Sequence, residues 1–112
     1  MTADTPGDRK QLFVRRIVES RQAGELVVFE AEGATVEYEN RTLRVELSSD
    51  ERDRLEDSLE AYHVFKIKQP ETRKADESIV YLSAVTDAKH AADFVEVLFR
   101  DVYGLSEEYE LQ

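Results

Sequence analysis

The strongest hydrophobic pattern lies near the end of the chain. An apolar run at residues 79–85 is typical of a buried strand, and a long helical period follows it at residues 88–103. Thr86 is predicted to cap this helix through its hydroxyl, and Asp87 places a negative charge at the positive end of the helix dipole. Gly104 can adopt the left-handed conformation that ends a helix. We expect the core to be built on the apolar face of this helix, which repeats at about 100° per residue and comprises Ala88, Ala91, Ala92, Val95, Leu98, Phe99, Val102 and Tyr103.

Two apolar side chains of this helix lie outside that face. Phe94 is at its border, and Val97 falls among polar neighbours. One explanation is that the sheet or another helix extends far enough to cover them, because scattered apolar residues need no special role. The other explanation is a contact with a second chain. It predicts a partner-binding surface made of Phe94, Val97, His90 and Asp101.

Four more segments have the pattern of strands. Three of them alternate between apolar and polar positions and are separated by tight turns, which indicates an antiparallel meander with one solvated face. The fourth is shorter and carries two lysines. The four segments are residues 26–31, 34–39, 42–47 and 63–68.

Two further helices are indicated by their first residues. Asp8 can cap a helix that runs to about residue 22, with Gln11 as its capping-box partner. Ser48 and Glu51 form a second capping box, and the helix that follows is densely charged with few apolar positions. This second helix is therefore expected to lie shallowly on the surface.

The elements occur in the order α-β-β-β-α-β-β-α. This order predicts an α+β fold with a single, mainly antiparallel five-stranded sheet and helices on one face. We expect one domain at residues 8–105, a flexible tail at residues 1–7 and an acidic tail at residues 106–112. The tail keeps Tyr109 and Leu111, which can fold back onto the domain.

This element order, with the small size and the low isoelectric point, resembles the type III secretion chaperone-like fold and the YbjN-like domains. The resemblance covers most of the chain and includes no motif that matches residue by residue. It implies a homodimer that binds a partner polypeptide. A small uncharacterised haloarchaeal family fits the same features equally well.

The charge balance is unusual. The chain has 25 acidic and 15 basic residues, a formal net charge of -10, and no cysteine. Such an excess keeps a protein dissolved but opposes compaction by self-repulsion, which high salt relieves. We therefore favour a salt-adapted, cytoplasmic protein over an ordinary acidic one. No apolar run approaches the length of about 20 residues that spans a bilayer, so no membrane association is expected.

The residues that carry chemistry form no recognisable constellation. Only His63 and His90 supply imidazoles. Asp87, His90 and Asp93 share a helix edge, but a solvated helix face explains them better than a metal site. No serine lies in a nucleophile motif and no glycine-rich loop is present. We therefore expect no catalytic residues, no metal and no cofactor.

Basic charge gathers in one segment, which we call the basic hairpin: Lys66, Lys68, Arg73 and Lys74. Lysines on a sheet edge discourage pairing with other chains, which explains them without any ligand. They could also contact a phosphate or an acidic partner. Nucleic-acid binding by the whole chain is disfavoured because the overall negative charge repels phosphate.

The function expected from these features is a non-enzymatic protein-interaction or chaperone-like domain that forms homodimers and binds a further protein. Two alternatives stay open. One is a small enzyme or ligand-binding domain with acidic residues in a cleft between sheet and helices. The other is a nucleic-acid-associated factor that uses the basic hairpin.

Overall fold

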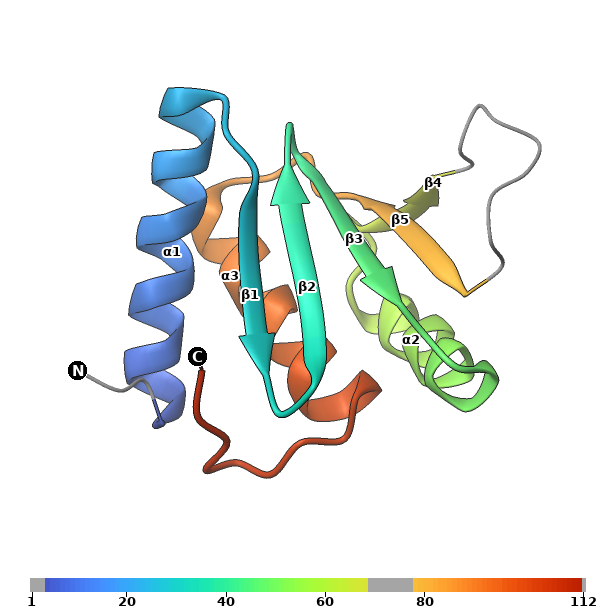
Figure 1. The fold of residues 1–112 in the computed structure, drawn as a ribbon. Coiled ribbons are helices and arrows are strands. Elements are labelled where there is room, and N and C mark those ends of the chain that lie inside the picture. Colours follow the sequence, from blue (N-terminus) through green and yellow to red (C-terminus); the bar gives the residue numbers. More distant parts are fainter. Residues whose placement is uncertain (1–3, 69–77, 112) are drawn as a thin grey trace.

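A computed structural model describes residues 4–68 and 78–111. It confirms the α+β fold, the five-stranded antiparallel sheet and the predicted element order (Figure 1). The last helix continues as a short π-helix, η1. The elements are α1 (Pro6–Ala23), β1 (Val27–Ala31), β2 (Ala34–Glu39), β3 (Thr42–Glu46), α2 (Ser49–Ala61), β4 (Lys66–Lys68), β5 (Ile79–Ser83), α3 (Ala88–Val97) and η1 (Leu98–Val102).

The strand order across the sheet is β1-β2-β3-β5-β4, and neighbouring strands are antiparallel. β1, β2 and β3 form the predicted meander. The chain then crosses through α2 to the far edge, where β4 forms, and returns as β5 between β3 and β4. β1 and β4 are therefore the two edge strands, and β3 is the central one.

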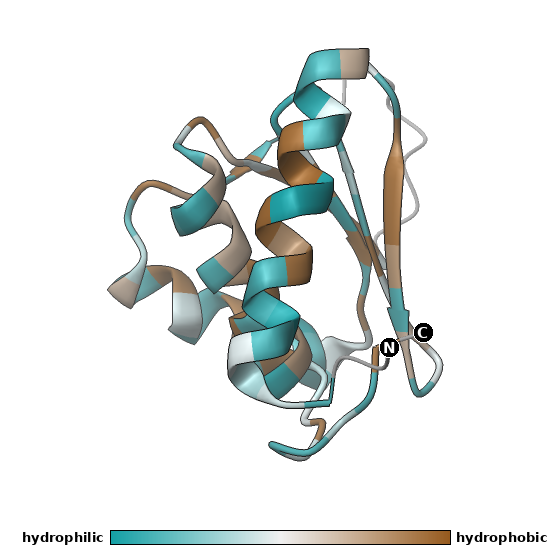
Figure 2. Cartoon of the chain, turned by 90° about the vertical axis from the view of Figure 1, so that its left-hand side faces the viewer, coloured by the Kyte–Doolittle hydropathy of each residue, from teal (hydrophilic) through white to brown (hydrophobic). Residues whose placement is uncertain are grey.

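Helices cover one face of the sheet, as Figure 2 shows from the side. The strands alternate between buried and exposed residues, so each strand turns every second side chain toward the helices. Phe13 of α1 joins the two layers. Its ring lies 4.9 Å from that of Phe29 on β1 and 6.1 Å from that of Phe99 on η1. Among the residues that the structure describes, no helix lies against the other face of the sheet.

The helix starts differ from the predicted ones by one to three residues. α1 begins at Pro6, and its cap is Thr5, whose hydroxyl accepts from the Asp8 N–H. Proline suits this position because its ring fixes a helical φ and the first turn needs no N–H there. α3 is capped by Asp87 instead of Thr86. The capping box of α2, Ser48 with Glu51, is confirmed.

The last helix ends through a π-helical turn. The Tyr103 N–H bonds the carbonyl of Leu98, five residues back, at 2.9 Å. Gly104 then takes a φ of 77°, as predicted, and the Leu105 N–H bonds back to the carbonyl of Phe99 at 3.0 Å. This ending carries Tyr103 to the end of the sheet.

Of the two explanations given for Phe94, the structure supports coverage by the protein's own core, because its side chain is fully buried. The segment between α2 and β4 covers it. The Phe65 ring stacks on the Phe94 ring at 4.2 Å, and the Tyr62 ring meets it edge-on at 5.5 Å. Val97 is half-buried and packs against the same core.

A buried arginine joins both ends of the chain. The Arg9 side chain is 0% exposed. Its guanidinium binds both carboxylate oxygens of Glu96 on α3, at 3.0 and 2.7 Å, and donates to the carbonyls of Glu107 and Tyr109. It also lies 3.8 Å from the centre of the Tyr109 ring. The segment expected to be a tail thus contributes Tyr109 and Leu111 to the core.

Arg9→Met should lower the free energy of unfolding by about 3–5 kcal/mol, because it leaves the Glu96 carboxylate half-buried without its cationic partner. Chemical denaturation measures this. Arg9→Met combined with Glu96→Leu should recover part of the loss, since an apolar pair of similar volume replaces the ion pair. A loss under about 1 kcal/mol for Arg9→Met would contradict the role given to this guanidinium.

Candidate functional site

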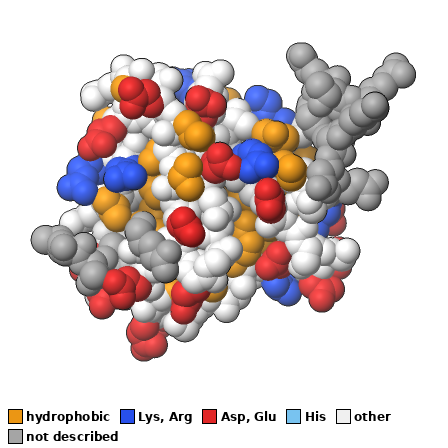
Figure 3. All heavy atoms as spheres, in the orientation of Figure 1, with side chains coloured by type: hydrophobic (Ala, Val, Ile, Leu, Met, Phe, Trp, Pro, Cys, Tyr) orange, Lys and Arg blue, Asp and Glu red, His pale blue; other side chains and the backbone are white. Residues whose placement is uncertain are grey.

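The face of the sheet that no helix covers is the main candidate surface, and we call it the open face. Figure 3 looks onto it and shows apolar, acidic and basic side chains side by side. Apolar groups on it include Val28, which is 42% exposed, and the half-buried Ile79 and Tyr81. The strand positions that face outward are Val28, Glu30, Thr35, Glu37, Glu39, Thr42, Arg44, Glu46, Lys66, Lys68, Ile79, Tyr81 and Ser83.

Charge on the open face is graded across the sheet. β1 and β2 present Glu30, Glu37 and Glu39, which together carry -3, whereas β5 and β4 present only Lys66 and Lys68, which carry +2. On the central strand β3, Arg44 and Glu46 cancel. The Arg44 guanidinium binds Glu37 at 2.5 Å and Glu46 at 3.3 Å. One half of the face is thus acidic, the middle is neutral and the far edge is basic.

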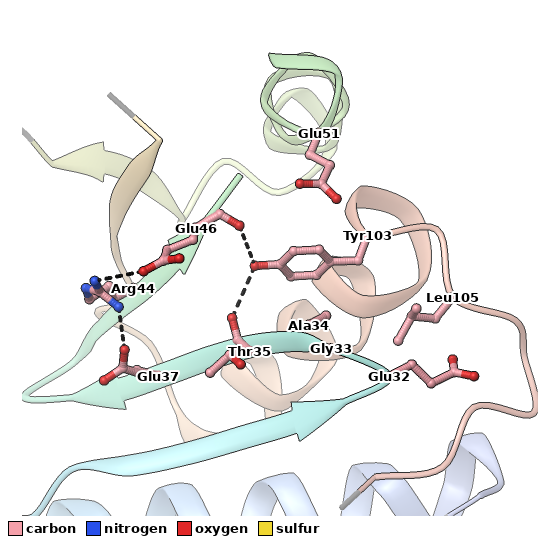
Figure 4. Close-up of a pocket in the computed structure, with 10 residues that line it drawn as sticks. All are labelled: Glu32, Gly33, Ala34, Thr35, Glu37, Arg44, Glu46, Glu51, Tyr103 and Leu105. Carbon is pink, nitrogen blue, oxygen red and sulfur yellow. Dashed lines mark hydrogen bonds and ion pairs between the residues drawn. The ribbon is translucent and has the colours of Figure 1, made fainter. Parts of the chain in front are cut away.

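A hollow of about 410 Å³ lies at one end of the open face, and Figure 4 shows it. Tyr103 reaches into it from the end of η1. The Tyr103 hydroxyl lies 3.1 Å from the carbonyl oxygen of Thr35 and 3.0 Å from that of Glu46. These two carbonyls stand where the β2–β3 ladder ends, one residue beyond the Val36–Val45 pair. The Tyr103 hydroxyl donates to carbonyls that would otherwise need a backbone N–H from a further residue pair of the ladder.

The lining of the hollow is acidic. Glu32, Glu37, Glu46 and Glu51 face a single cation, Arg44, which makes a formal charge of -3. Burial, with the nearby Glu51 carboxylate, raises the pKa of Tyr103 to about 12. The phenol therefore stays protonated at neutral pH and serves as a hydrogen-bond donor. The arrangement suits cationic groups and hydrogen-bond acceptors better than proton transfer.

The residues predicted on the last helix do not converge. His90 Nδ1 lies 2.9 Å from the carboxylate of Asp87, whose pKa is lowered by the His90 backbone N–H and by the imidazole. Asp93 points to α1 and pairs with Lys10 at 2.7 Å. Asp101 is exposed. Among the residues that the structure describes, no three acidic or histidine side chains are placed to hold a metal ion.

The partner-binding surface predicted on α3 stays a prediction, but it loses its main apolar residue because Phe94 is buried. Of the basic hairpin, Lys66 and Lys68 lie exposed on β4. The Lys68 ammonium donates to the Thr42 hydroxyl at 3.3 Å, so this side chain lies across the open face. Arg73 and Lys74 lie outside the described residues.

On the open face and in its hollow, Lys66 and Lys68 are the residues that the sequence predicted as site residues. Arg44, Tyr81 and Tyr103 are among those that it missed. Period two puts Arg44 and Tyr81 on outward positions, so alternation alone could have marked them. Tyr103 was assigned to the apolar face of the last helix. Its contact with the sheet end depends on the π-helical turn, for which the hydrophobic period gives no signal.

The whole chain, residues 1–112, matches a family of unknown function, DUF7975. The protein belongs to the DUF7975 family. This agrees with the expected uncharacterised family and gives no support to the resemblance to type III secretion chaperone-like or YbjN-like domains. No curated protein and no solved structure matches this DUF7975 chain.

None of the helices within residues 4–68 and 78–111 is long and apolar enough to cross a bilayer.

Tyr103→Phe should lower the free energy of unfolding by about 1–3 kcal/mol, because it leaves the Thr35 and Glu46 carbonyls without their donor. It should also change the alkaline response. The raised pKa means that the unfolded chain loses the Tyr103 proton near pH 10, whereas the folded chain keeps it to about pH 12. Stability therefore falls with rising pH across this window.

Denaturant unfolding at several pH values between 9 and 11.5 would measure that fall. The fall should be shallower in Tyr103→Phe than in the unmodified protein. Burial also raises the pKa of Tyr109, which keeps the remaining slope in both proteins. Parallel curves for the two proteins would contradict the environment described for Tyr103.

Proposed function

We propose that this DUF7975 protein is a non-enzymatic protein-interaction domain and that the open face is its binding surface. One observation carries the proposal: a sheet of five strands presents Val28 and the half-buried Tyr81 and Ile79 among graded charges, and no helix within the described part of the chain lies against them. Tyrosine is a common anchor in protein interfaces, because its ring gives a large contact area and its hydroxyl can bond at the rim. Charges around such an anchor give a partner its orientation.

The two alternative functions receive less support. In the hollow, the Arg44 guanidinium already pairs Glu37 and Glu46, and the Tyr103 phenol is fully protonated near neutral pH. A cationic ligand is the best candidate for a ligand-binding role, because the lining carries -3. A nucleic acid on the open face would contact the two lysines of β4 at one edge but also the acidic strands β1 and β2 at the other. Its phosphates would therefore be repelled over most of the face.

Homodimer formation, salt adaptation and a cytoplasmic location belong to the same proposal. Support for salt adaptation comes from the net charge of -10. Support for a protein partner comes from the open face. In this proposal the surface predicted at Val97 and His90 is secondary, because the burial of Phe94 removes the apolar area that favoured it.

A photoreactive phenylalanine at position 81 tests the binding surface. Irradiation of cells that natively produce the protein should give discrete cross-linked products, because Tyr81 lies on the open face, on β5 between the central strand and the edge strand β4. The same residue at position 57, an exposed position of α2, is the matched control and should give only background. Equal products from both positions would argue against the open face.

The salt dependence of thermal stability tests the proposed salt adaptation. The thermal midpoint should rise between about 0.1 M and about 1 M potassium chloride, because the Debye length shortens from about 10 Å to about 3 Å. Asp53→Lys with Asp57→Lys changes the net charge from -10 to -6 and should make the rise shallower. A flat or falling midpoint in the unmodified protein would speak against salt adaptation.

A further inference from the structure

The graded charge of the open face specifies what can pack on it. The acidic half lies on β1 and β2, the neutral strand β3 is in the middle, and the basic edge is β4. A surface of this kind is complementary to itself after a half-turn. We propose that a second copy of this chain packs on the open face, with a two-fold axis parallel to the strands and running along β3. This rests on the proposed function and names its partner.

The axis direction follows from the strand order. A half-turn about an axis along β3 reverses the order β1-β2-β3-β5-β4, so β1 faces β4 of the second copy and β2 faces its β5. In the strand registers, Glu39 on β2 is then level with Lys66 of the second copy, one strand away, and Glu30 on β1 lies two residues along from Lys68. A half-turn about an axis across the strands would place β1 on β1 and β4 on β4, so that acid meets acid and lysine meets lysine. The charges therefore favour the first axis.

The uncharged groups fit the same arrangement. Two packed sheets lie about 10 Å apart with their strands inclined by about 30°. Tyr81 on β5 would face Glu37 on β2 of the second copy, beside a hollow of about 250 Å³ that Glu37, Glu39, Arg44 and Tyr81 of one chain line in part. Val28 on β1 would meet the apolar stems of the lysines on β4. Arg44, near the axis, keeps its charge balanced by Glu37 and Glu46 of its own chain.

Edge protection is the competing explanation of the lysines. β4 is an edge strand, and lysines there would hinder pairing with other chains without any role in a face-to-face contact. The two explanations differ in what charge reversal does. Lysines that only protect an edge can be replaced by other charges with no effect on a face-to-face dimer.

The test uses two variants of the full chain. The basic variant carries Glu30→Lys and Glu39→Lys, and the acidic variant carries Lys66→Glu and Lys68→Glu. All four positions are exposed, so both variants should fold. Each variant alone would bring like charges together at both edges and should weaken the dimer about tenfold or more. Mixed together, they restore opposite charges at both edges and should form a heterodimer.

Sedimentation at about 0.15 M and about 1 M salt measures whether each protein is a monomer or a dimer. Asp53→Lys with Asp57→Lys is the matched control, because it makes the same change in net charge as the basic variant but on the outside of α2, and it should leave the dimer in place. The loss in each single variant should be smaller at the higher salt, since screening weakens the edge contacts.

Three results would overturn the inference: a monomer in the unmodified protein at both salt levels, no loss in the two variants, or no heterodimer on mixing. A stronger dimer in the basic variant would also overturn it. If the unmodified protein is a monomer while position 81 still cross-links to another protein, only this inference fails and the proposed function stands.

Discussion

The arrangement of the helical layer depends on the buried guanidinium of Arg9. Burying this charge is costly, and the cost is offset because Glu96 binds it through two oxygens and two backbone carbonyls accept two more of its N–H groups. Glu96 precedes the π-helical turn, whereas Glu107 and Tyr109 follow it. One side chain of α1 thus holds the chain on both sides of the turn that carries Tyr103. The hollow at the end of the open face is therefore positioned from the opposite end of the chain.

Much of the fold could be predicted because its signals are local. The alternation of apolar and polar residues predicted the strands, and the capping box of Ser48 and Glu51 predicted the start of α2. Each of these signals needs only neighbouring residues. The cap positions were less predictable. Threonine and aspartate are both preferred cap residues, so neither Thr5 and Asp8 nor Thr86 and Asp87 can be separated with certainty by residue type. The proline at position 6 selects Thr5.

The candidate site could be predicted only in part, because it depends on contacts between distant segments. Phe94 was placed at the border of the core by a projection of its own helix. It is buried because Tyr62 and Phe65, outside any helix or strand, lie against it. The outward positions of Glu39 and Lys66 follow from alternation. Their separation across the sheet does not, since it requires β5 to enter between β3 and β4.

The net charge and the charge gradient act on different scales in the proposed dimer. Two chains of -10 each repel at long range, so salt sets whether copies can approach. The gradient acts at contact distance, where the two ends of the open face have opposite signs, so it sets how the copies are oriented. An acidic protein can therefore self-associate with a defined axis while unlike or misaligned partners are repelled. Within this proposal, the two lysines of β4 determine the orientation of the copies, because the described part of the open face has few other cations to oppose its acidic residues.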